Sequence, residues 1–153
     1  MSTAPYTLEQ NVEEGSRQLL TFSLNDQDFG IDILRVQEIR NFTRVTPIPN
    51  MPESVRGVMN LRGTVIPIVD LRCRFAMPTA DYTQFTVIIV VNVGTKVMGL
   101  VVDAVSDVLD VGADSIEPPP SMNGIDTAFI TGLAKAGDRL VTVLNIDELL
   151  GDK

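Results

Sequence analysis

Hydrophobic and polar residues alternate along most of this 153-residue chain, and a two-residue period is typical of β-strands that bury one face. The alternating segments come in pairs, and each pair is joined by a short stretch rich in the residues that favour tight turns, Asn, Asp and Gly. Such pairs predict β-hairpins. They are 18–24 with 29–31, 57–63 with 64–71 through a turn near Arg62-Gly63, 85–93 with 97–102, and 130–134 with 140–144.

Three other segments interrupt this alternation. Ile33, Val36 and Ile39 follow one another at three-residue spacing, which fits either a short helical turn or an irregular strand. Three prolines within 47–52 predict a connector, because proline cannot donate a hydrogen bond to a neighbouring strand. Pro118 to Pro120 predicts a surface loop for the same reason.

A short helix is predicted close to the end of the chain. Asn145 can cap it, Asp147 and Glu148 place negative charge in its first turn, and Gly151 follows its expected last residue, Leu150. Elsewhere the short strands, separated by Gly, Pro and Asn, predict a mostly β chain built from small barrels. A sheet of alternating strands and helices is not favoured.

Composition adds limits on the cellular setting. Hydrophobic residues make up 44% of the chain, enough for a core without disulfides, and the single Cys73 excludes an internal one, so a reducing cytoplasm fits. Residues 1–16 lack the features of a signal peptide and are predicted to form a flexible tail. The longest apolar run, Val87 to Val91, is far shorter than the ~18 residues of a membrane span, so no membrane insertion is predicted.

The charge distribution points to a protein partner more than to a nucleic acid. A net charge of −8 argues against binding to a phosphate backbone, which requires a basic surface. The charge is −5 over residues 1–32, +4 over 33–74 and −7 over 81–153. The arginine-rich middle segment can form a positive face for an acidic protein, although ordinary solvated arginines explain it equally well.

The residue types of common active sites are scarce in this sequence. There is no histidine, so the commonest general base and metal ligand is missing, and no glycine-rich phosphate-binding loop matches. Cys73 lies between two arginines, which could activate a thiol, but a reactive thiol also needs a positioned base. An unreactive residue at the end of a strand is the favoured interpretation of Cys73.

A group of aspartates is the remaining candidate for chemistry. Asp103, Asp107, Asp110 and Asp114 lie close together in sequence, but their spacing lacks the pattern of a calcium-binding loop. We therefore predict no catalytic residue, no metal and no cofactor. A small hydrolase that uses these aspartates or Cys73 is the distant alternative, and it predicts activity that is lost in Asp107→Asn or Cys73→Ser.

Four stretches carry a family resemblance over nearly the whole chain. They are FGIDILRVQEI at 29–39, GVMNLRGTVIPIVDLR at 57–72, VVDAVSDVL at 101–109 and NIDELL at 145–150. In residues, order and spacing these stretches resemble the CheW family of bacterial chemotaxis coupling proteins. The resemblance implies one CheW-like domain over 17–150, made of two packed SH3-like five-stranded barrels, with lobe 1 at about 17–82 and lobe 2 at about 83–150.

The resemblance also implies a function without catalysis. A CheW-like protein is expected to link the cytoplasmic tips of chemoreceptors to the regulatory domain of the histidine kinase CheA, and to join other coupling subunits in rings. The protein would be cytoplasmic and recruited to membrane-associated arrays. An auxiliary coupling protein of a non-flagellar motility or developmental pathway is the alternative within the same class.

Particular residues are expected at the partner-binding surface because they match the family's positions. Glu38 and Arg62 would be its polar anchors, and for Arg62 the expected place at a hairpin tip agrees, since an exposed guanidinium offers five donors. The alternative interpretation of Arg62 is a solvated turn residue. Further candidates are Val36, Ile39, Gly57 and Leu61, with Val87 and Val105 on the side of the second lobe. Of these, Gly57 has an alternative interpretation as a turn residue, and the three valines and Ile39 have one as core residues.

Overall fold

A computed structural model describes residues 16–43, 45–78, 81–112, 115–119 and 127–150 of the chain. Residues 1–15 of the expected tail, together with Asp114 and Pro120, lie outside these described residues. The strands are β1 (Ser16–Leu24), β2 (Gln27–Asp32), β3 (Val36–Asn41), β4 (Val55–Leu61), β5 (Thr64–Asp70), β6 (Val87–Val93), β7 (Lys96–Val102), β8 (Ala104–Gly112), β9 (Ile116–Glu117), β10 (Ile130–Ala136) and β11 (Arg139–Leu144). The helical elements are η1 (Ile33–Arg35), α2 (Leu71–Arg74), η3 (Thr127–Phe129) and α3 (Ile146–Leu150).

The predicted fold class is confirmed. The chain is mostly β, its strands form two sheets that make two open SH3-like lobes, and all four predicted hairpins are present. The C-terminal helix is confirmed as well, with Asn145 as its cap, since the Asn145 Oδ1 accepts the Glu148 N–H at 3.1 Å. The ambiguous segment around Ile33 contains both predicted forms, a 3-10 turn in η1 followed by the irregular strand β3.

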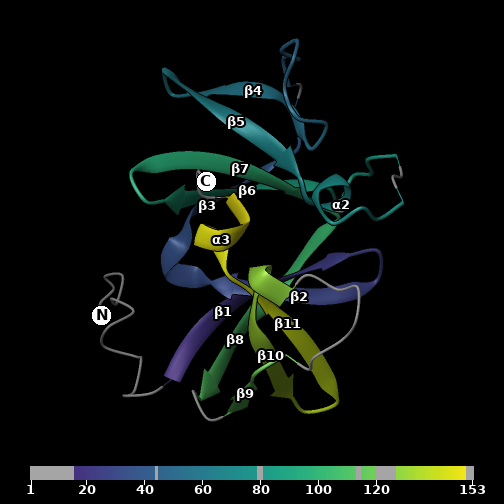
Figure 1. Cartoon of the computed structure of the whole chain (residues 1–153), viewed down its shortest axis with the longest axis vertical. Coiled ribbons are helices and arrows are strands. Elements are labelled where there is room, and N and C mark those ends of the chain that lie inside the picture. The colour runs from purple at the N-terminus through teal and green to yellow at the C-terminus, as the bar shows by residue number, and fades with distance from the viewer. Residues whose placement is uncertain (1–15, 44, 79–80, 113–114, 120–126, 151–153) are drawn as a thin grey trace.

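The two sheets differ in how they use the chain. A six-stranded sheet has the order β8-β1-β2-β11-β10-β9, and a five-stranded sheet has the order β3-β6-β7-β5-β4. We call residues 36–102 the inserted lobe, and residues 16–32 with those described after 103 the terminal lobe. Figure 1 shows the inserted lobe above the terminal lobe, with α3 between them.

The arrangement of the lobes along the chain differs from the expected one, in which one lobe followed the other with a boundary between residues 82 and 83. Instead, the inserted lobe lies between the two segments of the terminal lobe. The strands after residue 103 return to the N-terminal hairpin, because β8 pairs antiparallel with β1 and β11 pairs parallel with β2. The two-residue strand β9 gives the terminal lobe a sixth strand. Hydrophobic alternation marks where strands are, but it carries no information about which strands pair.

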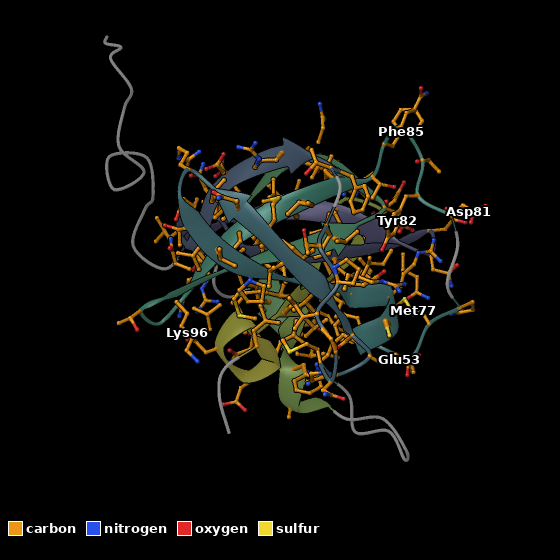
Figure 2. The ribbon with its side chains drawn as sticks, turned by 90° about the horizontal axis from the view of Figure 1, so that it is seen from above. Glu53, Met77, Asp81, Tyr82, Phe85 and Lys96 are labelled. Carbon is orange, nitrogen blue, oxygen red and sulfur yellow. The ribbon has the colours of Figure 1, made fainter. Side chains whose placement is uncertain are left out.

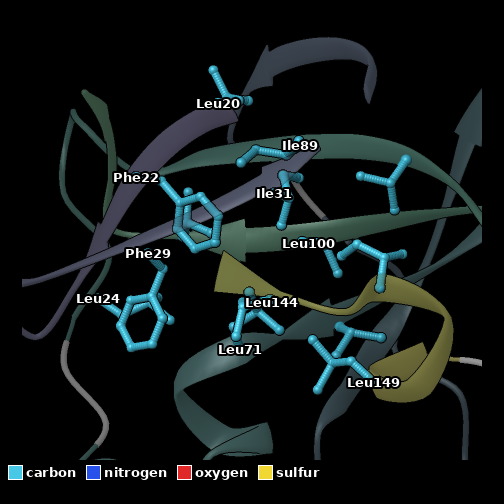
Figure 3. Packing of buried hydrophobic residues seen from close by; sticks show 14 of the residues in the cluster. Leu20, Phe22, Leu24, Phe29, Ile31, Leu71, Ile89, Leu100, Leu144 and Leu149 are labelled. Carbon is cyan, nitrogen blue, oxygen red and sulfur yellow. The ribbon is translucent and has the colours of Figure 1, made fainter. Parts of the chain in front are cut away.

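Three clusters of buried residues hold the fold together, and the largest is shared by both lobes. In this shared core, Phe22 and Ile31 of the terminal lobe pack with Ile89 and Leu100 of the inserted lobe, and Leu149 of α3 packs against them (Figure 3). A second cluster lies within the inserted lobe and a third within the terminal lobe. The shared core makes the two lobes one packed unit.

Gly57 occupies a position in β4 that admits no side chain. Its φ is +149°, and a Cβ there would lie 2.6 Å from the carbonyl carbon of Thr46. Thr46 approaches so closely because it forms a two-way bridge with Val58, in which both N–H···O distances are 2.9 Å. This bridge ties the proline-rich connector to the edge of the inserted lobe.

We expect Gly57→Ala to lower the free energy of unfolding by about 2–4 kcal/mol, because the Thr46 backbone must move and its bridge must break. Gly94→Ala is the matched control. Its φ is also positive, at 62°, but nothing lies within 4 Å of the added Cβ, so the loss should be only about 1 kcal/mol. Urea denaturation measures both losses, and equal losses would contradict the role assigned to Thr46.

Candidate partner-binding site

The site begins at the turn that joins β4 to β5. Leu61 pairs with Thr64, so the turn consists of the two residues Arg62 and Gly63, whose φ angles are 50° and 91°. Two positive φ angles are typical of a type I′ turn, which suits the right-handed twist of a hairpin. The Asn60 Oδ1 accepts the Gly63 N–H at 2.7 Å and fixes the turn. The predicted hairpin tip is therefore confirmed.

Arg62 is an unusual residue for this turn position. Asn, Asp and Gly are preferred where φ is positive, and a residue with a long side chain costs about 1–2 kcal/mol there. The Arg62 side chain is 61% exposed, so no buried packing offsets this cost. A residue in an unfavourable backbone conformation whose side chain has no packing role is a candidate for a functional residue.

Glu38 reaches Arg62 from the opposite edge of the same sheet. In β3 the register shifts between Val36 and Glu38, so that Val36 is opposite Val91 and Glu38 is opposite Val90. The Glu38 carboxylate accepts hydrogen bonds from Arg62 Nη2 and, at 3.3 Å, from Arg40 Nη1. Because β3 and β4 are the two edge strands, this ion pair spans the open side of the inserted lobe.

The two charges stabilise each other's ionised form. The hydrogen bond from Arg62 is the main reason why the pKa of Glu38 lies below its ordinary value, with a smaller contribution from Arg40. The same hydrogen bond raises the pKa of Arg62. One carboxylate is thus shared by two guanidinium groups, which leaves this corner of an acidic protein with a local positive charge.

A hollow of about 200 Å³ lies beside Arg62. Its floor includes Leu61, which is only 5% exposed and belongs to the core of the inserted lobe. Leu61 and Arg62 are predicted from the sequence, whereas the other lining residues are not. These are Gln37, Thr64, Ile66 and Val97.

A sequence signal existed for only some of the missed residues. Thr64 directly follows the predicted turn, so the hairpin register alone would have placed it beside Leu61. Gln37 lies opposite no residue of β6, at a bulge that the sequence does not mark. Val97 comes from a different hairpin, and only the pairing of β5 with β7 brings it close.

The other predicted site residues lie elsewhere. Val36, Val87 and Val105 are half-buried and pack against the shared core. Ile39 is 44% exposed and belongs to β3, the strand that carries Glu38. Gly57 lies in β4 beneath the Thr46–Val58 bridge. Its contribution to the surface is the absence of a side chain, which lets the Thr46 backbone lie close to β4. The structure therefore brings together Glu38, Arg62 and Leu61.

A second polar cluster anchors the loop that follows α2. The almost buried Asp70 accepts hydrogen bonds from Arg56 Nε at 3.2 Å and from the Tyr82 hydroxyl at 2.8 Å, and it caps α2 through the Arg72 N–H. Burial, and next the hydrogen bond to Asp70, raise the pKa of Tyr82 to about 12. Figure 2 shows Tyr82 on one side of the inserted lobe and Lys96 on the other.

Two of the aspartates considered for catalysis are engaged in separate contacts. Asp107 accepts hydrogen bonds from Thr21 Oγ1 and Arg139 Nη1, whereas Asp103 accepts them from Arg72. Cys73 is half-buried in α2. Within the described residues, no three His, Cys, Asp or Glu side chains gather as metal ligands would. No helix in that part of the chain is long and apolar enough to span a membrane.

An exposed arginine at a hairpin tip beside a hollow is a group that can bind an acidic protein partner. The family model of the CheW-like domain matches residues 18–153. The chain therefore belongs to the CheW family of chemotaxis scaffold proteins.

Individual relatives agree with this assignment. The chain is 44% identical to the Chemotaxis protein CheW of Klebsiella aerogenes over 92% of its own length and 86% of that protein. It is 39% identical to the Probable chemotaxis protein CheW of Rhizobium etli, over 94% and 93% of the two chains. The crystal structure of the scaffolding protein TtCheW from Thermoanaerobacter tengcongensis superposes with a TM-score of 0.83 at 37% identity, over 89% of this chain and 95% of that one.

The Glu38–Arg62 pair has a measurable signature in the titration of Glu38. Because the pKa of Glu38 in the folded protein is lowered, the pair stabilises the fold above the ordinary pKa of glutamate and is lost as the pH falls through the lowered value. We expect the carboxyl ¹³C shift of Glu38 to titrate below pH 4.5 in the wild type and at a higher pH in Arg62→Gln. Identical midpoints in the two proteins would show that the pair does not persist in solution.

Proposed function

We propose that this chain is a non-catalytic chemotaxis adaptor that couples methyl-accepting chemoreceptors to the histidine kinase CheA. Family membership supports the scaffold role, and the observation that carries the site is Arg62, held exposed and strained at a hairpin tip. The partners would be the CheA regulatory domain, the cytoplasmic tip of the receptors and other coupling subunits in rings. The protein would act in the cytoplasm at membrane-associated arrays.

The proposed mechanism is control of the kinase by docking. An adaptor that binds two proteins through fixed surfaces can make the state of one depend on the state of the other, provided that its contacts differ between the two states. The free energy for signalling then comes from these differential contacts, and no chemical step in the adaptor is needed. Two lobes packed on one shared core provide the rigid body that this mechanism requires.

At the site, Arg62 and Glu38 would have different tasks. The exposed guanidinium of Arg62 can donate to an acidic side chain of a partner, and the hollow beside it can accept an apolar group. Glu38, with its side chain 25% exposed, would orient Arg62 and keep it extended across the open edge of the lobe. Leu61 and Gly57 would shape this corner from below, and Ile39 would extend its apolar surface.

Val36, Val87 and Val105 are proposed as residues that act on the partner surface indirectly. Their side chains pack against the shared core, so substitutions there would change how the lobes fit together. The names of the more similar relatives favour chemotaxis over an auxiliary pathway, since they are chemotaxis proteins.

The test is calorimetric binding of the chain to a CheA regulatory domain and to a receptor cytoplasmic fragment from the same organism. We expect saturable binding to both, and we expect Arg62→Glu to weaken at least one of them by about tenfold or more. The fold should remain intact in this variant, because the side chain is exposed. Unchanged binding by a folded Arg62→Glu protein would exclude Arg62 from the interface.

A charge-swapped double variant, Glu38→Arg with Arg62→Glu, separates the two tasks of the ion pair. It restores an ion pair within the chain while it reverses the charge at the hairpin tip. If a partner contacts Arg62, binding stays weak in the double variant. A return to wild-type affinity would mean that only the internal ion pair matters. Asp107→Asn and Cys73→Ser should leave both affinities unchanged, as expected if neither residue has a chemical role.

A further inference from the structure

Within the described residues, the chain passes between the two lobes at two places. It enters the inserted lobe through η1, residues 33–35, and it leaves through the single residue Asp103, which lies between β7 and β8. In Figure 1 this second passage is the continuous descent from β7 into β8. Short connections that join two packed bodies are the places where a hinge motion is absorbed.

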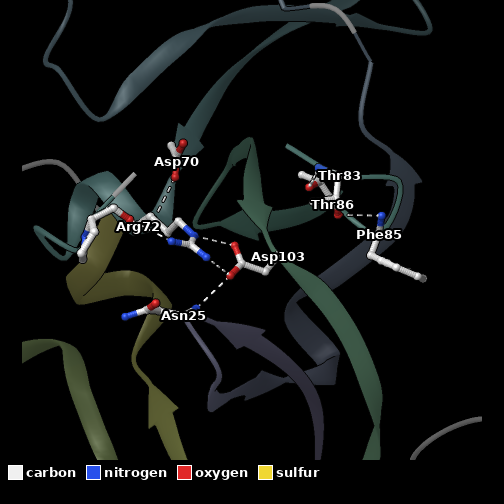
Figure 4. Close-up of polar contacts among 8 residues, drawn as sticks. Asn25, Asp70, Arg72, Thr83, Phe85, Thr86 and Asp103 are labelled. Atoms are coloured by element: carbon white, nitrogen blue, oxygen red, sulfur yellow. Dashed lines mark hydrogen bonds and ion pairs between the residues drawn. The ribbon is translucent and has the colours of Figure 1, made fainter. Parts of the chain in front are cut away.

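At the second passage, Asp103 is bonded to both lobes at once. Its two carboxylate oxygens accept hydrogen bonds from Arg72 of α2, in the inserted lobe, with Nε–Oδ1 and Nη2–Oδ2 distances of 2.7 and 2.5 Å. The Oδ2 also accepts the backbone N–H of Asn25, in the β1–β2 turn of the terminal lobe, at 2.8 Å (Figure 4). The backbone N–H of Asp103 donates to Ser23 of β1 at 3.1 Å.

At the first passage, Arg35 makes an analogous pair of contacts. Its Nη2 donates to the Asp147 Oδ2 of α3, in the terminal lobe, at 2.5 Å. Its Nη1 donates to the carbonyl oxygen of Asn92 in β6, in the inserted lobe, at 3.4 Å. The two side chains of this ion pair are 37% and 52% exposed, compared with 16% and 29% for Arg72 and Asp103, so the Asp103 contacts are the stronger.

Apolar packing and polar contacts contribute differently to the angle between the lobes. The shared core holds the lobes together, but the hydrophobic effect itself is not directional. Bidentate arginine–carboxylate hydrogen bonds do depend on direction. The Arg72–Asp103 pair is bidentate, whereas Arg35 makes one hydrogen bond to Asp147 and one to the carbonyl oxygen of Asn92. Each passage therefore carries one charged residue that contacts both lobes.

We propose that Asp103 and Arg35 are positioning residues that clamp the two passages and fix the orientation of the inserted lobe relative to the terminal lobe. The clamps matter for function because partners bound to different lobes can influence each other only through a fixed orientation, a role that rests on the function proposed above. A looser adaptor would still bind each partner, but it would transmit less between them.

The orientation is measured by pulsed electron–electron double resonance between spin labels at Thr95→Cys and Asp138→Cys, in a Cys73→Ser background. These two positions are exposed turn residues, one in each lobe. The test variants are Asp103→Asn, which preserves side-chain size, and its combination with Arg35→Gln, which keeps a polar side chain but removes the guanidinium. Lys135→Gln is the control, because it breaks the Lys135–Glu117 ion pair inside the terminal lobe. Thermal melts check that every variant folds.

The clamp predicts one narrow distance distribution in the parent protein and in Lys135→Gln. Asp103→Asn should broaden or shift it, and the combined variant should do so further. An unchanged distribution in the folded combined variant would overturn the proposal, because apolar packing alone would then set the orientation. The distance measurement needs no binding partner, so its outcome is independent of the proposed function.

The functional role is tested with the kinase regulatory domain and the receptor fragment. In the combined variant, each partner should bind alone within about twofold of the parent, whereas the effect of the first partner on the affinity for the second should fall by about fivefold or more. A broadened distribution with full coupling would overturn the functional role. A parent protein that binds neither partner would contradict the proposed function, and the distance measurement would still decide the clamp.

Discussion

The shared core is the constraint on which the rest of the molecule depends. Strands β6 and β7 are buried on both faces, since Ile89 and Leu100 point into the shared core while Ile88 and Val101 point into the core of the inserted lobe. A sheet with hydrophobic residues on both faces is destabilised when one face is open to water, because that apolar surface stays hydrated. The inserted lobe therefore needs the terminal lobe to cover it, although the chain joins them only through η1 and Asp103.

This arrangement explains where strain can be tolerated. The β4–β5 hairpin is anchored by Leu61 and Ile66 in the core of the inserted lobe, so its tip can carry Arg62 in an unfavourable backbone conformation without loss of the fold. The tip also lies at the open edge of the sheet, where Glu38 from the other edge strand can reach it. A rigid hairpin thus presents a charged group at a defined place.

The sequence was sufficient for the local elements and insufficient for their assembly. Alternation and turn residues predicted the four hairpins, the cap at Asn145 and the position of Arg62, because all of these depend on neighbours in the chain. The nesting of the lobes was predicted wrongly, since it depends on pairing between strands as distant as β1 and β8. The contact between Glu38 and Arg62 likewise followed from neither spacing nor charge, and the family resemblance named the two residues only as separate anchors.

Burial divides the residues that the resemblance suggested into two physical classes. Arg62 and Ile39 are exposed and can touch a partner directly, whereas Val36, Val87 and Val105 pack against the shared core. A substitution at one of the three valines alters the fit between the lobes. The relative position of a surface on one lobe and a surface on the other then changes, although neither surface carries the substitution. Such changes would therefore lower the coupling between two bound partners, as the loss of the clamps at Asp103 and Arg35 would, more than they would remove a single contact. If the chain acts as the proposed adaptor, the orientation of the lobes is as much a part of its site as the side chains that would contact the partner.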